Sequence, residues 1–209
     1  REVARAHPDR LARVLVPHQL ARVVGTAREV DRPAPGVPVD DDQVRDLENL
    51  PRRSRLLRGE AVGDVTAIMQ ENGLKFGVDL LGGHKTGYYL DQRENHAIVG
   101  QLAQGGSVLD VFSYTGGFAL HALQAGAAEV LCLDQSASAL TRLSANADLN
   151  GLPKPKSIEG DAFKELRSLR DTGARFDVVI LDPPKFAQNA GQVEQAARGY
   201  KDINMLGFK

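Results

Sequence analysis

Acidic side chains accompany four successive hydrophobic segments of this 209-residue chain, and their spacing is the pattern most able to do chemistry. Asp110 lies within the first segment, and Asp134, Asp161 and Asp182 follow the next three. Carboxylates accept charge-assisted hydrogen bonds, so they can bind hydroxyl groups, ammonium groups and base edges. In an open α/β sheet the carboxyl ends of the strands line one crevice. We therefore expect these four side chains to line a single ligand cleft.

A glycine pair follows the first segment, in the sequence Asp110-Val111-Phe112-Ser113-Tyr114-Thr115-Gly116-Gly117-Phe118. Gly116 and Gly117 would let the backbone approach a ligand without a Cβ in the way. The dinucleotide fingerprint G-x-G-x-x-G is absent here, and a carboxylate on the strand suits an ammonium group better than a pyrophosphate.

Each acidic residue then has an expected partner in one ligand. Asp110 would orient the amino-acid end of a zwitterion, directly or through water. Asp134 would accept both hydroxyls of a ribose. Asp161 and the amide of Ala162 would bind an adenine edge. Amino acid, ribose and adenine in that order make S-adenosylmethionine, which is the cofactor we predict.

The sequence after the fourth segment is Asp182-Pro183-Pro184-Lys185-Phe186. Two prolines fix φ and remove two amide donors, so they would form a rigid, extended turn. Asp182 would accept a hydrogen bond from a ring or exocyclic nitrogen of a planar base. Lys185 would neutralise a phosphate or remain in solvent, and Phe186 would stack on a base or belong to the core. This stretch is our candidate target-base site, and a base reaches such a cleft only when unpaired or flipped out.

Apolar periodicity predicts alternating helices and strands from residue 91 onward. The expected helices are residues 91–103, 116–125, 137–149, 162–170 and 191–207, and the expected strands are residues 107–111, 128–133, 156–159 and 176–181. This alternation predicts an α/β fold with a Rossmann-like, doubly wound and mostly parallel sheet. Because such a sheet usually has about six strands, we expect this one to be truncated at the C-terminus.

The region before residue 91 has a different pattern, which predicts a small α+β unit. Pro8 and the apolar face after it predict a short helix over residues 8–16. Residues 20–24 and 54–58 are expected strands, and the Pro- and Asp-rich residues 31–43 are an expected linker. Two alternating segments, residues 64–70 and 74–81, flank Asn72-Gly73, which is a β-hairpin signal.

Composition and charge narrow the class of protein. A net charge of −1 argues against attraction of the whole chain to nucleic acid. The cluster Arg52, Arg53, Arg55 and Arg58 fits either an RNA-backbone contact or a solvated surface. The single cysteine excludes an internal disulfide and fits a reducing compartment. We find no signal peptide, no metal-binding pattern and no apolar run near the roughly 20 residues of a membrane helix. We expect a cytoplasmic protein with no membrane contact and with both chain ends cut.

Together these motifs resemble those of class I S-adenosylmethionine-dependent methyltransferases. A further stretch narrows the resemblance, namely Gly83-His84-Lys85-Thr86-Gly87-Tyr88-Tyr89-Leu90-Asp91-Gln92-Arg93-Glu94-Asn95. It is similar to the segment that opens the catalytic domain in the bacterial 23S ribosomal RNA cytosine-C5 methyltransferases. The resemblance covers residues 50–209 well and residues 1–50 more loosely.

The resemblance implies a role for each matching residue. Tyr88 and Arg93 would flank the methionine end of the cofactor, with Arg93 pairing with its carboxylate. The methionine portion would be wrapped by Phe112, Tyr114, Thr115 and Gly116. Asp134 and Ser136 would hold the ribose, and Asp161 and Ala162 would contact adenine. Taken singly, these residues also have plain structural explanations: Asp110 and Asp161 as caps, Arg93 as a solvated helix residue and Tyr88 as a core aromatic.

The resemblance also implies a domain order and a partner. Residues 1–50, with the linker, would be part of a small RNA-binding or central domain. Residues 51–90 would form a hairpin segment that leads into the catalytic domain, and residues 91–209 would bind S-adenosylmethionine. The implied partner is RNA, specifically 23S ribosomal RNA, and a homodimer is one assembly we consider.

Methylation of cytosine at C5 requires a nucleophile, because attack of a thiolate at C6 makes C5 reactive. Cys132 lies within the expected strand 128–133, so we expect an inert core thiol there. The resemblance places the nucleophilic cysteine beyond the fourth strand and the next helix, after Lys209.

Three functions therefore remain open. The first is C5 methylation of a cytosine in large-subunit ribosomal RNA. The second is N-methylation of a guanine or adenine, which needs only orientation and proton removal. The third is a module that binds cofactor or RNA without catalysis. A nicotinamide dehydrogenase ranks below them because the glycine triplet is absent.

Overall fold

The computed structural model describes residues 13–15, 66–80, 87–187 and 189–209. The expected strands at residues 20–24 and 54–58, the linker at residues 31–43 and the arginine cluster lie outside the described residues. So does the segment from Gly83 to Thr86. The division of the chain into three domains therefore stays a prediction.

A parallel sheet organises the described part of the chain. Its strands are β1 (Arg13–Leu15), β4 (Ser107–Val111), β5 (Glu129–Asp134), β6 (Lys156–Glu159) and β7 (Val178–Leu181). Their order is β1-β7-β4-β5-β6, and every neighbouring pair is parallel. The α/β fold with a doubly wound parallel sheet is thus confirmed.

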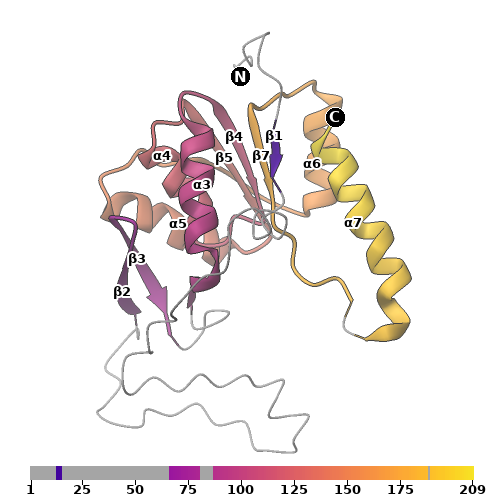
Figure 1. Ribbon diagram of the computed structural model, residues 1–209, viewed down its shortest axis with the longest axis horizontal. Helices are drawn as coiled ribbons and strands as arrows, with labels where there is room; N and C mark the ends of the chain where they lie inside the picture. The colour runs from indigo at the N-terminus through magenta and orange to yellow at the C-terminus, as the bar shows by residue number, and fades with distance from the viewer. Residues whose placement is uncertain (1–12, 16–65, 81–86, 188) are drawn as a thin grey trace, which may run out of the picture.

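Helices cover both faces of this sheet (Figure 1). They are α3 (Arg93–Ala103), α4 (Gly117–Gln124), α5 (Ala137–Leu149), α6 (Ala162–Asp171) and α7 (Val193–Gly207). Short 3-10 turns precede α3 and α7, at Leu90–Gln92 and Ala190–Gln192. Among the described residues, no helix combines the length and the apolar character that crossing a membrane would require.

The core divides between the two faces because side chains alternate along each strand. On one face, α3, α4 and α5 pack against Val108, Val130, Cys132, Val178 and Ile180. On the other, α6 and α7 pack against Leu109, Val111, Leu133, Val179 and Leu181. All four residues of β7 are buried, as its unbroken apolar sequence predicted.

The strand β1 corrects the prediction of a helix over residues 8–16. Arg13, Val14 and Leu15 pair with Val178, Val179 and Ile180 of β7 and extend the sheet from four strands to five. A short apolar run has too few residues for its period to distinguish a helix from a strand. Here the backbone groups on the open side of β7 supply hydrogen-bond partners that no local pattern reveals.

A hairpin outside this sheet matches its sequence signal. Strands β2 (Thr66–Glu71) and β3 (Leu74–Asp79) are antiparallel, with Glu71 opposite Leu74. Asn72 and Gly73 have φ angles of 48° and 87°. Positive φ at both central residues is what a two-residue type I′ turn requires, and Asn-Gly is the sequence that best accepts it.

Candidate cofactor and target-base site

The loop after β4 has a strained backbone. Phe112 and Tyr114 have φ angles of 64° and 47°, and Gly116 has a φ of 92°. Positive φ costs free energy in residues other than glycine, so it persists only where the surroundings enforce it. The amides of Phe112 and Ser113 both donate to the carbonyl of Leu133, at 2.8 and 3.2 Å. The strained loop is thus held at the carboxyl edge of the sheet.

Asp134 ends β5 and anchors the same loop through its side chain. Its Oδ2 accepts a hydrogen bond from the Tyr114 amide at 2.8 Å, and its Oδ1 accepts one from the Ser136 amide at 2.9 Å. Each carboxylate oxygen can accept a second hydrogen bond. The half-buried carboxylate can therefore hold the loop and still accept two hydroxyl groups, which is the chemistry of a ribose contact.

Asp110 lies inside the sheet. It is 1% exposed, and its Cα is paired with those of Cys132 and Ile180 on the neighbouring strands. Neither carboxylate oxygen has a well-formed hydrogen bond to any described residue. Burial raises the pKa of Asp110 well above its ordinary value, and the backbone amide of Ala119 offsets only part of that effect. In this conformation a direct contact between Asp110 and a ligand in the cleft is closed off.

Ser136 and Asp161 are helix caps. Ser136 Oγ accepts the Ala139 amide at 3.2 Å at the start of α5, and Asp161 Oδ1 accepts the Lys164 amide at 2.9 Å at the start of α6. Asp161 is therefore the N-cap of α6, which is the structural role expected for it. The exposed Asp161 begins α6 and the buried Ala162 is its first residue. Amides in a first helical turn lack partners within the helix and can serve a ligand.

Asp182 follows β7 and is oriented by a residue from a distant part of the chain. Its Oδ2 accepts a hydrogen bond from Gln92 Nε2 at 3.0 Å, and Gln92 Oε1 accepts one from Asn95 Nδ2 at 2.6 Å. Gln92 and Asn95 lie in the stretch that carries the family resemblance, but neither is among the predicted site residues. The spacing of three residues at the start of a helix was the available signal, since such residues are neighbours on one face.

Adjacent tyrosines face different surroundings. Tyr88 is buried and its hydroxyl donates to Glu71 Oε1 at 3.0 Å, so it occupies the core position that was the plainer of its two interpretations. Tyr89 instead packs edge-on against Tyr114, with ring centroids 5.7 Å apart. Burial and the charge of Asp182 raise the pKa of Tyr89. Tyr89, and not the predicted Tyr88, is therefore the tyrosine that lies near the acidic strand ends.

The segment after Asp182 is fixed by α7. Tyr200 Oη accepts the Phe186 amide at 3.2 Å and donates to the Pro184 carbonyl at 3.3 Å. The rings of Phe186 and Tyr200 stack with centroids 4.5 Å apart, and Phe163 of α6 lies 6.0 Å from Phe186. Phe186 is half-buried, and its ring lies against Phe163 of α6 and Tyr200 of α7.

The two predicted cations remain exposed beside these groups. Arg93 is the first residue of α3, and its carbonyl accepts a hydrogen bond from Asn72 Nδ2 at 3.2 Å. Lys185 is exposed, next to the half-buried Pro183 and the exposed Pro184. The positions of both cations leave their charged groups accessible to an anionic ligand.

The glycine pair has a packing explanation that the sequence did not reveal. A Cβ on Gly116 would lie 2.8 Å from Leu143 Cγ, in addition to its φ of 92°. A Cβ on Gly117 would lie 2.6 Å from His96 Nε2. His96 is 3% exposed and packs edge-on against Phe118, so it has little room to retreat. The pair is required by these neighbours whether or not a ligand is bound.

Gly117→Ala is therefore expected to destabilise the fold by about 1–3 kcal/mol, the usual cost of overpacking a core. Thermal unfolding of the variant and the wild type measures the effect. Gly191→Ala is the control, because its Cβ would make an ordinary contact with Asn189 Oδ1 at 3.4 Å. Equal melting temperatures for Gly117→Ala and Gly191→Ala would contradict the collision with His96.

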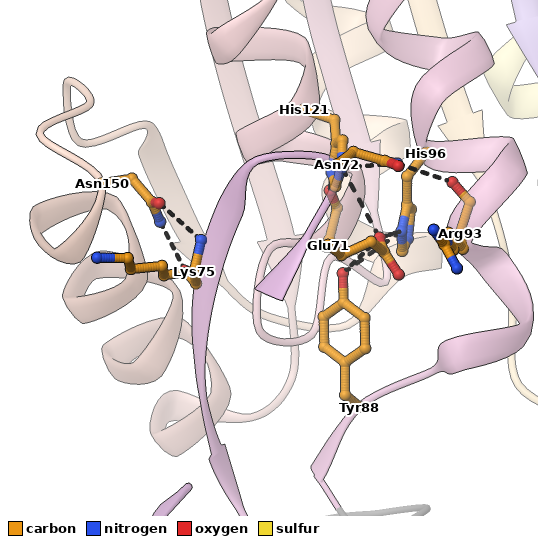
Figure 2. Close-up of polar contacts among 9 residues, drawn as sticks. Glu71, Asn72, Lys75, Tyr88, Arg93, His96, His121 and Asn150 are labelled. Atoms are coloured by element: carbon orange, nitrogen blue, oxygen red, sulfur yellow. Dashed lines mark hydrogen bonds and ion pairs between the residues drawn. The ribbon is translucent and has the colours of Figure 1, made fainter. Parts of the chain in front are cut away.

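A buried polar cluster is formed by Glu71, His96 and His121 (Figure 2). Glu71, His96 and His121 bring atoms of the metal-ligating kind within 4.8 Å of one another. Glu71 Oε1 accepts hydrogen bonds from Tyr88 and from His96 Nδ1, the latter at 2.7 Å, and His121 Nε2 lies 3.3 Å from Asn72 Nδ2. These contacts join the three side chains, Tyr88 and Asn72 into one hydrogen-bonded network.

The topology brings the candidate residues to one place. The chain runs from β4 through β5 to β6 on one side of β4, and then crosses to β7 on the other side. Ligands of open α/β sheets bind at such a reversal, outside the carboxyl ends of the strands. The strained loop follows β4, with Asp134 on one side of it and Asp182 on the other. The carboxyl ends of β4, β5 and β7 thus bring these groups to one edge of the sheet.

Known proteins share both the sequence and this fold. A family model described as S-adenosylmethionine-dependent methyltransferase matches residues 52–203. The chain belongs to this methyltransferase family. The cofactor of this family is S-adenosylmethionine, as predicted.

Two curated relatives illustrate the sequence similarity. Both are named Ribosomal RNA large subunit methyltransferase I. The protein from Tolumonas auensis is 50% identical over 171 residues, and that from Vibrio cholerae is 47% identical over 173 residues. In each case the match covers 81% of this methyltransferase and 43% of the relative. The chain therefore spans less than half the length of these relatives.

Two solved structures illustrate the similarity of fold. One, described as a methyltransferase complexed with S-adenosylhomocysteine (SAH), has a TM-score of 0.60 and 27% identity, and the match covers 71% of this methyltransferase and 41% of the other. The second is an S-adenosylmethionine-dependent methyltransferase from Agrobacterium tumefaciens. It has a TM-score of 0.58 and 29% identity, with coverage of 65% and 44%.

Proposed function

We propose that this chain holds S-adenosylmethionine at the β4–β7 switch point and presents it to an RNA base, within an enzyme that methylates large-subunit ribosomal RNA. The observation that carries the proposal is the arrangement of Asp134, which anchors the strained loop through one lone pair on each oxygen and keeps the other two for a ribose. The named function of relatives 47–50% identical supports RNA as the substrate class.

The residues of the cleft match the parts of this cofactor. The first-turn amides of α6, beside Asp161 and Ala162, would receive the adenine edge. Arg93 would pair with the methionine carboxylate. Asp110, a buried carboxylate without a hydrogen-bond partner among the described residues, fits a water-mediated contact to the ammonium group rather than a direct one. The bound cofactor supplies an electrophilic methyl group.

The target base would bind at Asp182 and the two prolines after it. Gln92 Nε2 donates to Oδ2 of Asp182 at 3.0 Å and so orients this carboxylate, which is an acceptor suited to a base nitrogen. Pro183 and Pro184 offer no amide donors, so this turn recognises a base through acceptors. A base that reaches it must leave its stack, as in other enzymes that act on bases.

Within this class we propose C5 of a cytosine as the methylated atom, in line with the family that the sequence resembles. Cys132 is 0% exposed, and burial followed by the nearby Asp110 charge raises the pKa of its thiol well above the ordinary value. An inert thiol cannot attack C6. C5 chemistry therefore requires a thiolate other than Cys132, whereas N-methylation of a guanine or adenine requires none.

Mass spectrometry of modified RNA tests the proposal. An enzyme that contains this chain together with a nucleophilic cysteine is incubated with 23S ribosomal RNA and S-adenosylmethionine carrying a labelled methyl group, and the RNA is digested to nucleosides. Labelled 5-methylcytidine is the expected product. A labelled N-methylguanosine or N-methyladenosine would contradict the C5 assignment, and no label in RNA together with normal SAH binding would contradict the RNA substrate.

Cys132→Ala is expected to leave methyl transfer unchanged while it lowers the free energy of unfolding by about 1 kcal/mol, the cost of a small core cavity. The thiol belongs to the buried cluster that contains Val108, Val130 and Ile180. Methylation rates and denaturant unfolding of the variant measure the two effects. Loss of methylation in a well-folded Cys132→Ala protein would show that this thiol takes part in the reaction.

A ribosomal RNA substrate would place the activity in the cytoplasm. The homodimer stays a prediction.

A further inference from the structure

The β2–β3 hairpin packs against the two helices that follow the strained loop and β5. Leu74, Phe76 and Val78 form a buried cluster with Leu120 of α4 and Ala147 of α5. Apolar contacts of this kind hold the hairpin in place without specifying the position of any backbone atom in the loop. The polar contacts at the same interface are directional, and they reach the loop itself.

Asn146 of α5 connects β3 to the loop. Its Oδ1 accepts a hydrogen bond from the Gly77 amide at 2.8 Å, and its Nδ2 donates to the Thr115 carbonyl at 3.1 Å. The side chain is 1% exposed. An amide can only donate and a carbonyl can only accept, so the two partners fix the orientation of the carboxamide. One buried side chain thus joins the backbone of the hairpin to the backbone of the loop.

A second connection ends two residues further along, at Gly117, the first residue of α4. His121 Nδ1 lies 2.7 Å from the Gly117 carbonyl and must be the donor, so Nε2 of the neutral ring is an acceptor and faces Asn72 Nδ2 of the hairpin turn at 3.3 Å (Figure 2). Burial lowers the pKa of His121, which favours this neutral form. Hairpin contacts therefore terminate on two carbonyls of the loop and its junction with α4.

The loop needs such support because its backbone is strained. On one side, Leu133 and Asp134 hold the amides of Phe112, Ser113 and Tyr114. On the other, Asn146 and His121 hold the carbonyls of Thr115 and Gly117. A conformation with positive φ at Phe112 and Tyr114 persists only where contacts over-determine it.

We propose that Asn146 is a positioning residue that couples the β2–β3 hairpin to the cofactor loop, so that the hairpin sets part of the affinity for the cofactor. The proposal rests on the assignment of this loop to S-adenosylmethionine made above. Asn146 does not touch the ligand; it fixes the Thr115 carbonyl and through it the shape of the loop.

Asn150 provides a matched control on the same helix. Its Oδ1 accepts the Lys75 amide at 2.7 Å, and its Nδ2 donates to the Lys75 carbonyl at 2.6 Å and to the Asn146 carbonyl at 2.7 Å (Figure 2). Like Asn146, it ties α5 to the backbone of β3. Both of the carbonyls to which it donates lie outside the cofactor loop.

Asn146→Asp and Asn150→Asp test the proposal as a pair. Each variant keeps the oxygen that accepts the β3 amide and loses the donor, but only Asn146→Asp loses a bond to the loop. Calorimetric titration with SAH gives the Kd, and thermal unfolding gives the stability of each protein. We expect the Kd to rise about tenfold for Asn146→Asp, within the range typical of coupling between sites, and to stay within about twofold for Asn150→Asp.

The outcomes distinguish a failure of the coupling from a failure of the cofactor-loop assignment. Equal Kd values for the two variants would overturn the coupling while leaving the cofactor site in place. Failure of the wild-type protein to bind SAH would overturn the assignment of the cofactor loop, and the coupling with it.

If Asn146→Asp does not fold, hydrogen exchange of the wild-type protein tests the coupling between the hairpin and the cofactor loop. Coupling is reciprocal, so a ligand that orders the loop must also strengthen the bond between Asn146 and Gly77. Hydrogen exchange of individual amides is followed with and without SAH. Slower exchange at Gly77 with little change at Lys75 is the expected result, and equal changes at both amides would overturn the proposal.

Discussion

Replacing Asp182 with alanine is expected to lower kcat for methyl transfer by at least about 100-fold, the lower range for a positioned acid or base, and to leave the Kd for SAH within about twofold of wild type. The carboxylate follows β7 and is held by Gln92 Nε2 at 3.0 Å. We propose that it accepts a hydrogen bond from the target base and does not bind the cofactor. Its removal therefore leaves the base unoriented in an otherwise intact cleft.

Single-turnover methylation and calorimetric titration with SAH separate the two effects. Asp171→Ala is the control, since this exposed carboxylate at the end of α6 pairs with Arg170 at 2.7 Å, away from the strand ends. Normal turnover in Asp182→Ala would remove the target-base role. A loss of SAH binding equal to the loss of turnover would move Asp182 into the cofactor site.

Asp134→Ala is expected to raise the Kd for SAH by about 10- to 100-fold, because hydrogen bonds to a charged group contribute about 1.5–3 kcal/mol. The variant loses the two acceptors for ribose hydroxyls. It also releases the Tyr114 and Ser136 amides, so the strained loop loses an anchor. Calorimetric titration with SAH measures the change in Kd.

Asp177→Ala is the matched control for Asp134. Asp177 Oδ2 accepts the Ser107 amide at 2.8 Å and the Ser107 hydroxyl at 3.0 Å, where the chain enters β7 and β4 at the opposite edge of the sheet. Both substitutions remove a carboxylate that holds backbone amides, but only one is at the proposed ribose site. An unchanged Kd in Asp134→Ala, or an equal rise in Asp177→Ala, would defeat the ribose assignment.

The sequence was sufficient for the elements after residue 91 because each had a clear period and a clear boundary. Helix α5, for example, begins after the cap Ser136 and ends before Asn150-Gly151, and its bounds match the prediction. The start of β7 was placed two residues early, at residue 176 rather than Val178. Strand β1 was missed altogether, because its pairing with β7 depends on residues more than 160 positions away.

The cleft was predictable only in outline. Asp134 and Asp182 could be identified because they follow strands, and the position of a strand end is a local property of the sequence. The contacts of Gln92 with Asp182 and of Asn146 with Thr115 join separate elements, so no local pattern marks them. The choice between Tyr88 and Tyr89 depends on which ring turns toward the core, and that orientation is set by Glu71 on the hairpin.

Calorimetric titration of the protein with SAH, and with NAD in a parallel experiment, tests the central claim most directly. The strand-end carboxylates and the absence of a dinucleotide fingerprint predict micromolar binding of SAH and no binding of NAD. Binding of NAD, or of neither ligand, would contradict the assignment of the β4–β7 switch point to S-adenosylmethionine.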